Sequence, residues 1–401
     1  MNSFDLSRQV SAQSAAFNRR ALILLGFLAP TVLILQPIFP DSIESLIIYL
    51  RMIVLPLGLA LMAKDSIHLS ALVALMGYAL AISIIGFQSD PDYAALIFVS
   101  LVGSVIMFRV GAIAADRFDS RDVWPAIIHG VSLVNAITIF LYVGVVIGFL
   151  DLSIIFDMVG RDSQLGYWRF ALGNAIETPF VVTALLAAAI RLAPKEKTFL
   201  GGALLNFVTA GISESRIVVL IAFLVFFTQL KKSGMLPKSF ALVSLGLAGY
   251  LLIDQVMPIL ESLGQRFMFS GSDYGSKDDR VALLSTALGS LSPYSLVIGA
   301  GLTGGAQLMS LEAGQYRTLE SALLQIIVEL GVVGLSLFSI ALVAGLRVRL
   351  SLRSLLNPIA LLSCAQILLF LPVHNQMPLT FAALGVLVTS VGRRQSRQAE
   401  T

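Results

Sequence analysis

Twelve apolar stretches alternate along this sequence with loops whose charge also alternates, and this pattern limits the chain to a membrane-embedded helical fold. Hydrophobic residues make up 57% of the sequence and charged residues only 13%, whereas a soluble domain carries about 25% charged residues. A helix of about 20 apolar residues crosses a bilayer. We therefore predict an all-α, polytopic bundle of about 12 transmembrane helices, of which the seventh, eighth and twelfth are short. The predicted spans are 21–39, 43–63, 66–87, 93–113, 125–150, 170–190, 198–212, 217–230, 239–256, 321–346, 355–372 and 379–392.

The basic residues predict the orientation of the bundle. Most of the 27 lysine and arginine residues lie in alternate loops, which the positive-inside rule assigns to the cytoplasm. The region after the fourth span contributes Arg109, Arg117 and Arg121 to this side. We expect both chain ends in the cytoplasm, with a leader at 1–20 and a tail at 393–401. The leader runs into the first span without a small-residue cleavage site, so no signal peptide is predicted.

One long segment, 257–320, separates the nine spans within 21–256 from the three within 321–392, and it falls on the outer side. Apolar residues recur at helical spacing over 280–291, which predicts a short surface helix within this loop. Gly299-Ala300-Gly301 and Gly304-Gly305 follow. This glycine stretch predicts a flexible connector or, alternatively, a backbone nest that binds an anion.

Seven basic residues fall on the outer side, and six of them are arginine. The orientation rule disfavours basic residues there, so their presence favours a function. The guanidinium group binds phosphate or carboxylate through paired hydrogen bonds. The alternative is that these residues are solvated loop charges or partners of nearby acids such as Asp162 and Asp279. The outer basic residues are Arg161, Arg169, Arg216, Arg266, Lys277, Arg280 and Arg317.

Three charged residues fall inside predicted spans, where charge is costly and tends to be functional or paired. Arg51, Glu177 and Glu329 each lie seven or eight residues inward from the outer end of their span. At about 1.5 Å of rise per residue, their depths in the membrane are similar. A buried pair between Arg51 and either acid is one interpretation, and a substrate cavity that opens outward is the other.

Several classes of site are excluded by composition. The single Cys364 and three histidines without an H-E-x-x-H pattern predict no metal site. No G-x-x-x-x-G-K-[ST] pattern is present, so we expect no ATP hydrolysis and no cofactor. The basic isoelectric point follows from the cytoplasmic loops and does not indicate binding of nucleic acid.

Three motifs occur in a recognisable order. In residues 320–334, ESALLQIIVELGVVG, a polar residue is followed by an apolar helix that ends in the pattern E-x-G-x-x-G. Ser215-Arg216 opens an earlier apolar run, and Arg280 lies upstream of Gly299-Ala300-Gly301. Over about residues 170–346 this order resembles the superfamily of Wzy-type O-antigen polymerases and O-antigen ligases. The sequence departs from that family at Glu320-Ser321, where ligases and many polymerases carry His-Asn, which favours a polymerase over a ligase.

The resemblance implies a glycosyltransferase of the bacterial inner membrane, with 257–320 in the periplasm. A polyprenyl-diphosphate-linked oligosaccharide is then the donor, and the hydroxyl of a second lipid-linked repeat unit is the acceptor. Arginines would neutralise the diphosphate, and a carboxylate would accept the hydroxyl proton. Membrane lipid, a chain-length regulator and other polysaccharide assembly proteins are the expected partners. An O-antigen ligase-like transferase and a secondary transporter or flippase of polysaccharide precursors remain the alternatives. The predicted catalytic residues are Glu320, Arg280 and Arg216, and the predicted substrate-binding residues are Arg161, Arg169, Arg266, Arg317, Arg51 and Glu177.

Overall fold

The protein is all-helical throughout the part of the chain that the computed structural model describes, as its apolar pattern predicts. No strand occurs within this part. The described residues are 23–24, 26–28, 66–84, 91–118, 122–150, 177–194, 199–213, 215–251, 289, 291–302, 321–346, 357–370 and 377–399.

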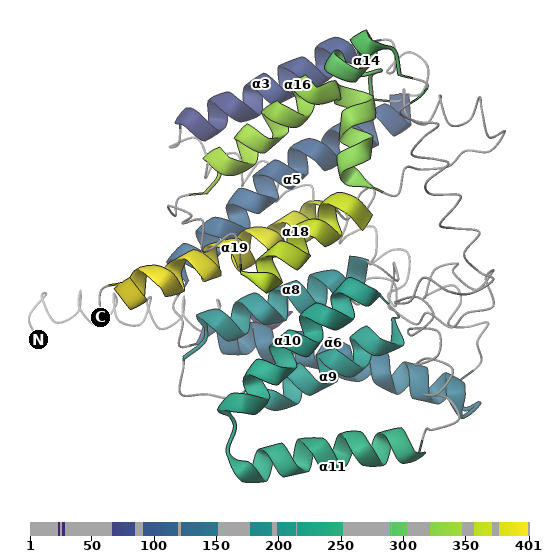
Figure 1. The fold of residues 1–401 in the computed structure, drawn as a ribbon, viewed down its shortest axis with the longest axis vertical. Coiled ribbons are helices and arrows are strands. Elements are labelled where there is room, and N and C mark those ends of the chain that lie inside the picture. The colour runs from purple at the N-terminus through teal and green to yellow at the C-terminus, as the bar shows by residue number, and fades with distance from the viewer. Residues whose placement is uncertain are drawn as a thin grey trace, which may run out of the picture. The chain divides into compact units, whose positions relative to one another are not determined.

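The helices coincide with predicted apolar stretches, with one exception (Figure 1). The exception is the six-residue α14, which Ser292 caps by accepting a hydrogen bond from the Ser295 amide and which begins with Pro293. The helices are α3 (Ser66–Ile82), α5 (Pro91–Arg117), α6 (Val123–Val146), α8 (Glu177–Leu192), α9 (Leu200–Ile212), α10 (Arg216–Lys232), α11 (Met235–Leu251), α14 (Pro293–Ile298), α16 (Ala322–Ala344), α18 (Pro358–Phe370) and α19 (Met377–Ala399).

Three of these helices are long and apolar enough to cross a membrane, judged by length and composition. They include residues Ala94–Arg117 of α5, Val123–Val145 of α6 and Ala322–Ala344 of α16. Other apolar helices within the described residues have 10–17 residues, as in α3 and α9. Membrane-helix character is therefore supported.

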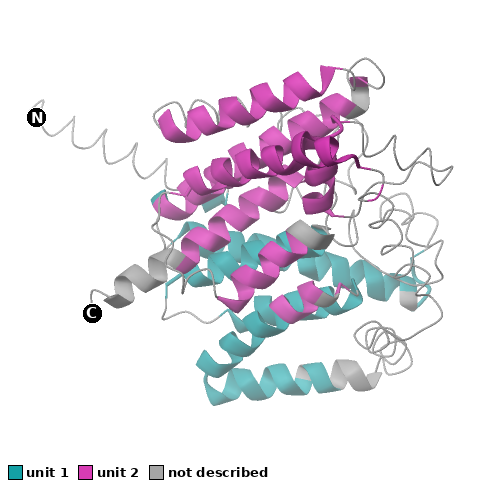
Figure 2. Cartoon of the chain, turned by 45° about the horizontal axis from the view of Figure 1, so that its top comes forward, with its two compact units in different colours: residues 1–47, 117–213, 222–251 teal, residues 48–116, 214–221, 252–401 magenta. Residues whose placement is uncertain are grey.

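The chain divides into two compact units (Figure 2). Unit 1 contains residues 1–47, 117–213 and 222–251, and its helices α6, α8 and α9 pack on one another. Gly202 of α9 allows close packing, because a Cβ atom there would lie 2.5 Å from the Ser132 Oγ atom of α6. Small residues at such positions bring membrane helices together.

Unit 2 contains residues 48–116, 214–221 and 252–401. Within it α16 packs against α3, α14 and α18, and α18 packs against α19. Phe381 of α19 makes edge-on ring contacts with Phe108 of α5, at 6.5 Å between centroids, and with Phe338 of α16, at 5.7 Å. These aromatic contacts join three helices of unit 2.

Helix α16 is broken, although its sequence predicts one continuous span over 321–346. Gly331 has φ 68° and ψ −175°, outside the helical region. Figure 1 shows α16 as two segments that meet at an angle beside α14. The segments before and after Gly331 are about 14 and 20 Å long at 1.5 Å per residue. Neither reaches across a hydrocarbon core of about 30 Å by itself.

Candidate functional site

Most of the predicted site residues lie outside the described part of the chain. Two of them fall within helices: Glu177 is the first residue of α8, and Arg216 is the first residue of α10. The two belong to different units, and their side chains are not described. Their roles stay predictions, as do those of the remaining site residues. The predicted site residues outside the described part are Arg51, Arg161, Arg169, Arg266, Arg280, Arg317 and Glu320.

At the break in α16, the backbone pairs with residues 298–302, which lie within the predicted outer loop. The Ala300 amide donates to the Val328 carbonyl and the Gly301 amide donates to the Glu329 carbonyl, each at 2.9 Å. Residues 298–302 and 328–331 thus pair backbone to backbone, and we call this arrangement the glycine clasp. A helix carbonyl freed at a break in a membrane must find another donor, and the clasp supplies two.

Glycine is required at two points of the clasp, because the backbones approach closely there. A Cβ atom on Gly331 would lie within 3 Å of three backbone atoms in 297–299. A Cβ atom on Gly299, which has φ 90°, would lie equally close to the backbone of Glu329 and Leu330. Positive φ adds strain for any residue with a side chain. These glycines therefore permit the pairing sterically.

Helix α3 and the residue after it, Ser83, bind residues 298–302 of the clasp through two hydrogen bonds. The Tyr78 hydroxyl donates to the Ile298 carbonyl at 2.7 Å. The Leu302 amide donates to the Ser83 Oγ atom at 3.1 Å, and this bond is buried. Three segments that are distant in the sequence therefore meet at one place: the end of α3, residues 298–302 and the break in α16.

The clasp contradicts both interpretations for Gly299-Ala300-Gly301, whereas Gly304-Gly305, the other part of the predicted glycine stretch, lies outside the described residues. The amides of residues 299–302 are fully used, since Gly299 donates to the Ser295 carbonyl and the next three donate to Val328, Glu329 and Ser83. No amide of residues 299–302 is left to bind an anion, so this stretch is not an anion nest. The same stretch is hydrogen-bonded to α16 and to Ser83 after α3, so it is not a free connector.

Glu329 lies in the last turn before the break and is only 1% exposed. Its Oε1 atom accepts a hydrogen bond from the Gln325 Nε2 atom at 3.2 Å. Its Oε2 atom has no hydrogen-bond partner within the described residues. The predicted ion pair with Arg51 is untested, because Arg51 lies outside them. The other prediction, a cavity that opens outward, is also untested, because the side chains of Arg51 and Glu177 are not described.

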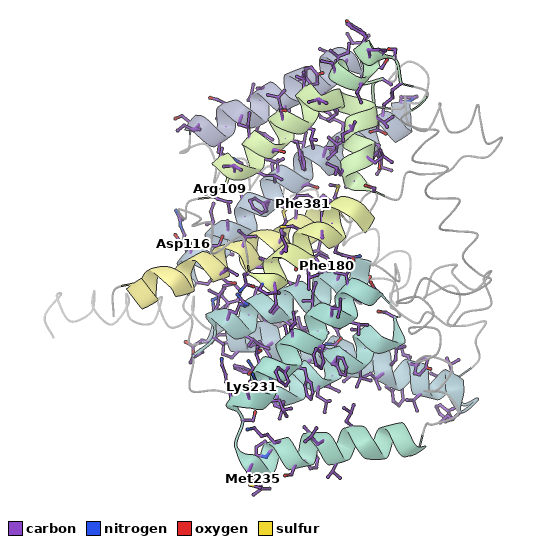
Figure 3. All side chains as sticks on the ribbon, viewed as in Figure 1. Arg109, Asp116, Phe180, Lys231, Met235 and Phe381 are labelled. Atoms are coloured by element: carbon purple, nitrogen blue, oxygen red, sulfur yellow. The ribbon has the colours of Figure 1, made fainter. Side chains whose placement is uncertain are left out.

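Arg109, which the charge pattern assigns to the cytoplasmic side, is a buried charge. It lies inside α5, where Figure 3 labels it, and is 1% exposed. Its Nη1 atom donates a hydrogen bond to the Gly345 carbonyl at the end of α16. Cations favour the carbonyl end of a helix, so Arg109 stabilises the last turn of α16. A signal was present, because residue 109 falls within the predicted span 93–113.

Unit 1 contains a second buried polar group that was not predicted. The Asn206 Oδ1 atom of α9 accepts hydrogen bonds from Thr183 of α8 at 3.2 Å and from Asn135 of α6 at 3.5 Å. All three side chains are at most 1% exposed. Polar bonds between apolar helices fix their mutual rotation, so this group sets the register of α6, α8 and α9.

The described residues contain no group of three or more acidic, cysteine or histidine side chains that could hold a metal ion. Their distinctive chemistry is a buried carboxyl beside a broken helix. A scan against family models finds no match, and neither the curated proteins nor the solved structures include a match to this chain.

Proposed function

We propose that the chain is a membrane polysaccharide polymerase that transfers a lipid diphosphate-linked glycan to the hydroxyl of another lipid-linked repeat unit. The observation that carries the proposal is the glycine clasp. The motifs Gly299-Ala300-Gly301 and E-x-G-x-x-G, which form part of the family resemblance, pair backbone to backbone in one unit. Motifs that belong to one functional element are expected to meet in this way.

In the proposed mechanism, Arg216 and Arg280 bind the diphosphate and neutralise the charge that develops as it leaves. Glu320 accepts the proton of the attacking hydroxyl. Arg161, Arg169, Arg266 and Arg317 contribute further contacts to the anionic donor. The sugar–diphosphate bond supplies the free energy, so no ATP is needed.

The proposal includes a location and a topology. About 12 spans cross the bacterial inner membrane, both chain ends lie in the cytoplasm, and 257–320 lies in the periplasm. The 19 residues from Leu302 to Glu320 would join the clasp to the start of α16 on that side. The polyprenyl carrier lies in the surrounding lipid, and a chain-length regulator and other assembly proteins act beside the chain.

The decisive experiment supplies purified protein in lipid with a synthetic polyprenyl-diphosphate-linked repeat unit and measures polymer length on a gel. We expect Arg216→Ala and Arg280→Ala to abolish polymer, and Arg→Lys to restore little, because an ammonium lacks the paired donors of a guanidinium. Glu320→Gln should slow transfer by about 10²–10⁴-fold. Arg394→Ala, in the predicted cytoplasmic tail, is the matched control and should remain active. Normal polymer from both alanine variants would refute the proposal.

Transport of polysaccharide precursors is the second candidate, and the broken helix α16 favours it. Secondary transporters place their sites at discontinuous membrane helices. Glu329 is an acid at such a position. A transporter would move a fluorescent lipid-linked oligosaccharide across a vesicle membrane without lengthening it. Lengthening without transbilayer movement supports the polymerase instead.

A further inference from the structure

The carboxyl group of Glu329 lacks a compensating charge in the described part of the chain. Its neighbours Val328 and Leu330 are fully buried, and its own side chain is 1% exposed. The amide of Gln325 donates one neutral hydrogen bond to Oε1, while Oε2 has no partner there. One such bond offsets only a small part of the cost of burying a negative charge.

Among the described residues, α3, α14 and α18, which pack on α16, carry no lysine or arginine. Their titratable groups are His68 and Tyr78 on α3, Tyr294 on α14 and Cys364 on α18. Tyr78 is bonded to the Ile298 carbonyl. Arg109 of α5 reaches α16 at Gly345, at the opposite end of the helix from the clasp.

The break adds a second electrostatic effect. Glu329 is the penultimate residue before Gly331 and therefore lies in the last turn of a short helical segment. The carbonyl end of a helix carries partial negative charge, which opposes an anion and favours a cation. The two clasp amides satisfy two of these carbonyls but bring no net charge.

We propose that Glu329 binds one small positive charge, either a proton or a sodium ion, at the break in α16. The buried carboxyl and the adjoining carbonyl end then form a neutral site instead of an uncompensated anion. An acid within a membrane helix that carries such a charge is typical of ion-coupled proteins. The inference holds for a polymerase or for a transporter, so its failure would not decide between them.

The test measures the thermal unfolding midpoint of purified full-length protein in detergent. Wild type is compared with Glu329→Gln, which keeps the shape but cannot carry the charge, and with Glu400→Gln as a control. In one arm, sodium chloride replaces choline chloride at constant ionic strength. In the other, pH is varied without sodium.

Each source of charge has its own result. A sodium site raises the midpoint of wild type and of Glu400→Gln by several degrees with added sodium, and leaves Glu329→Gln unchanged. A proton site binds its proton more in the folded than in the unfolded state. Wild type then loses stability relative to Glu329→Gln as pH rises. Parallel behaviour of all three proteins in both arms would overturn the inference.

An infrared measurement keeps the inference testable if Glu329→Gln does not fold. In sodium-free neutral buffer, wild type should show the carbonyl band of a protonated carboxyl, and Glu329→Asp should shift it. Loss of the band on adding sodium identifies a sodium site, and its persistence identifies a proton site. Absence of the band together with no effect of sodium on the midpoint would contradict both.

Discussion

Gly331 cannot accept a side chain unless the segment opposite it moves. Its φ of 68° lies in the region that L-residues rarely adopt, and a Cβ atom would lie within 3 Å of the backbone of residues 297–299. Gly77 of α3 is the opposite case, since a Cβ atom there would meet nothing within 4 Å. Two glycines of one unit therefore predict opposite effects of the same substitution.

We expect Gly331→Ala to lower the free energy of unfolding by about 1–3 kcal/mol from backbone strain alone, with the steric overlap adding to it. Gly77→Ala should leave stability unchanged or raise it by up to about 1 kcal/mol, because alanine favours a helix. The two variants are compared by thermal unfolding in detergent. Equal stability would mean that the clasp does not hold in the folded protein.

At the scale of elements, two side-chain hydrogen bonds join α3 and Ser83, the residue after it, to the clasp, and a single substitution can remove each of them. Ser83 accepts from the buried amide of Leu302, and Tyr78 donates to the carbonyl of Ile298. A buried amide without a partner costs about 1–3 kcal/mol, whereas loss of an ordinary hydrogen bond costs about 0.5–1.5 kcal/mol. The hydrogen bond from the Leu302 amide to Ser83 is therefore expected to contribute more to stability than the bond from Tyr78 to the Ile298 carbonyl.

Ser83→Ala should accordingly destabilise the protein more than Tyr78→Phe, by about 1–3 against about 1 kcal/mol. Hydrogen exchange followed by mass spectrometry should show faster exchange at 299–302 in Ser83→Ala. Ser132→Ala in unit 1 serves as the control, because its hydroxyl bonds within its own helix to the Ile128 carbonyl. If exchange at 299–302 is unchanged in Ser83→Ala, the segment does not depend on α3.

Hydropathy predicted most of the described helices but did not predict the break at Gly331 within α16. The predicted stretch 198–212 corresponds to α9 at 200–212. An apolar helix can be predicted because its pattern of apolar residues is contained in the local sequence. The break at Gly331 depends on Gly299 and on residues 300–301, about 30 positions away, and glycine in an apolar run gives no local sign of it. Most of the predicted outer arginines lie outside the described residues, so that part of the site stays a prediction.

At the scale of the whole molecule, large apolar side chains remain uncovered on the described surface. Met235, Leu236 and Phe240 of α11 are 86%, 84% and 73% exposed. Soluble proteins rarely leave such a contiguous apolar surface in water, whereas lipid covers it without cost. Lys231 lies in the last turn of α10, with its ammonium 4.6 Å from the ring centre of Phe227. Basic residues at the end of an apolar helix are typical of a membrane boundary.

The topology prediction follows from this surface and from the charge pattern. Arg109 is buried in α5, so the cytoplasmic assignment of the next loop now depends on Arg117 and Arg121. We expect fusions at Gly234, between α10 and α11, and at Arg394 to give cytoplasmic fluorescence of green fluorescent protein. A fusion at Ser272 should instead give periplasmic alkaline phosphatase activity. Both reporters are placed at all three sites, so that each fusion controls for expression of the other. A cytoplasmic result at Ser272 would put Arg266, Arg280 and Arg317 on the wrong side for a lipid-linked periplasmic donor, and the polymerase proposal would fail with it.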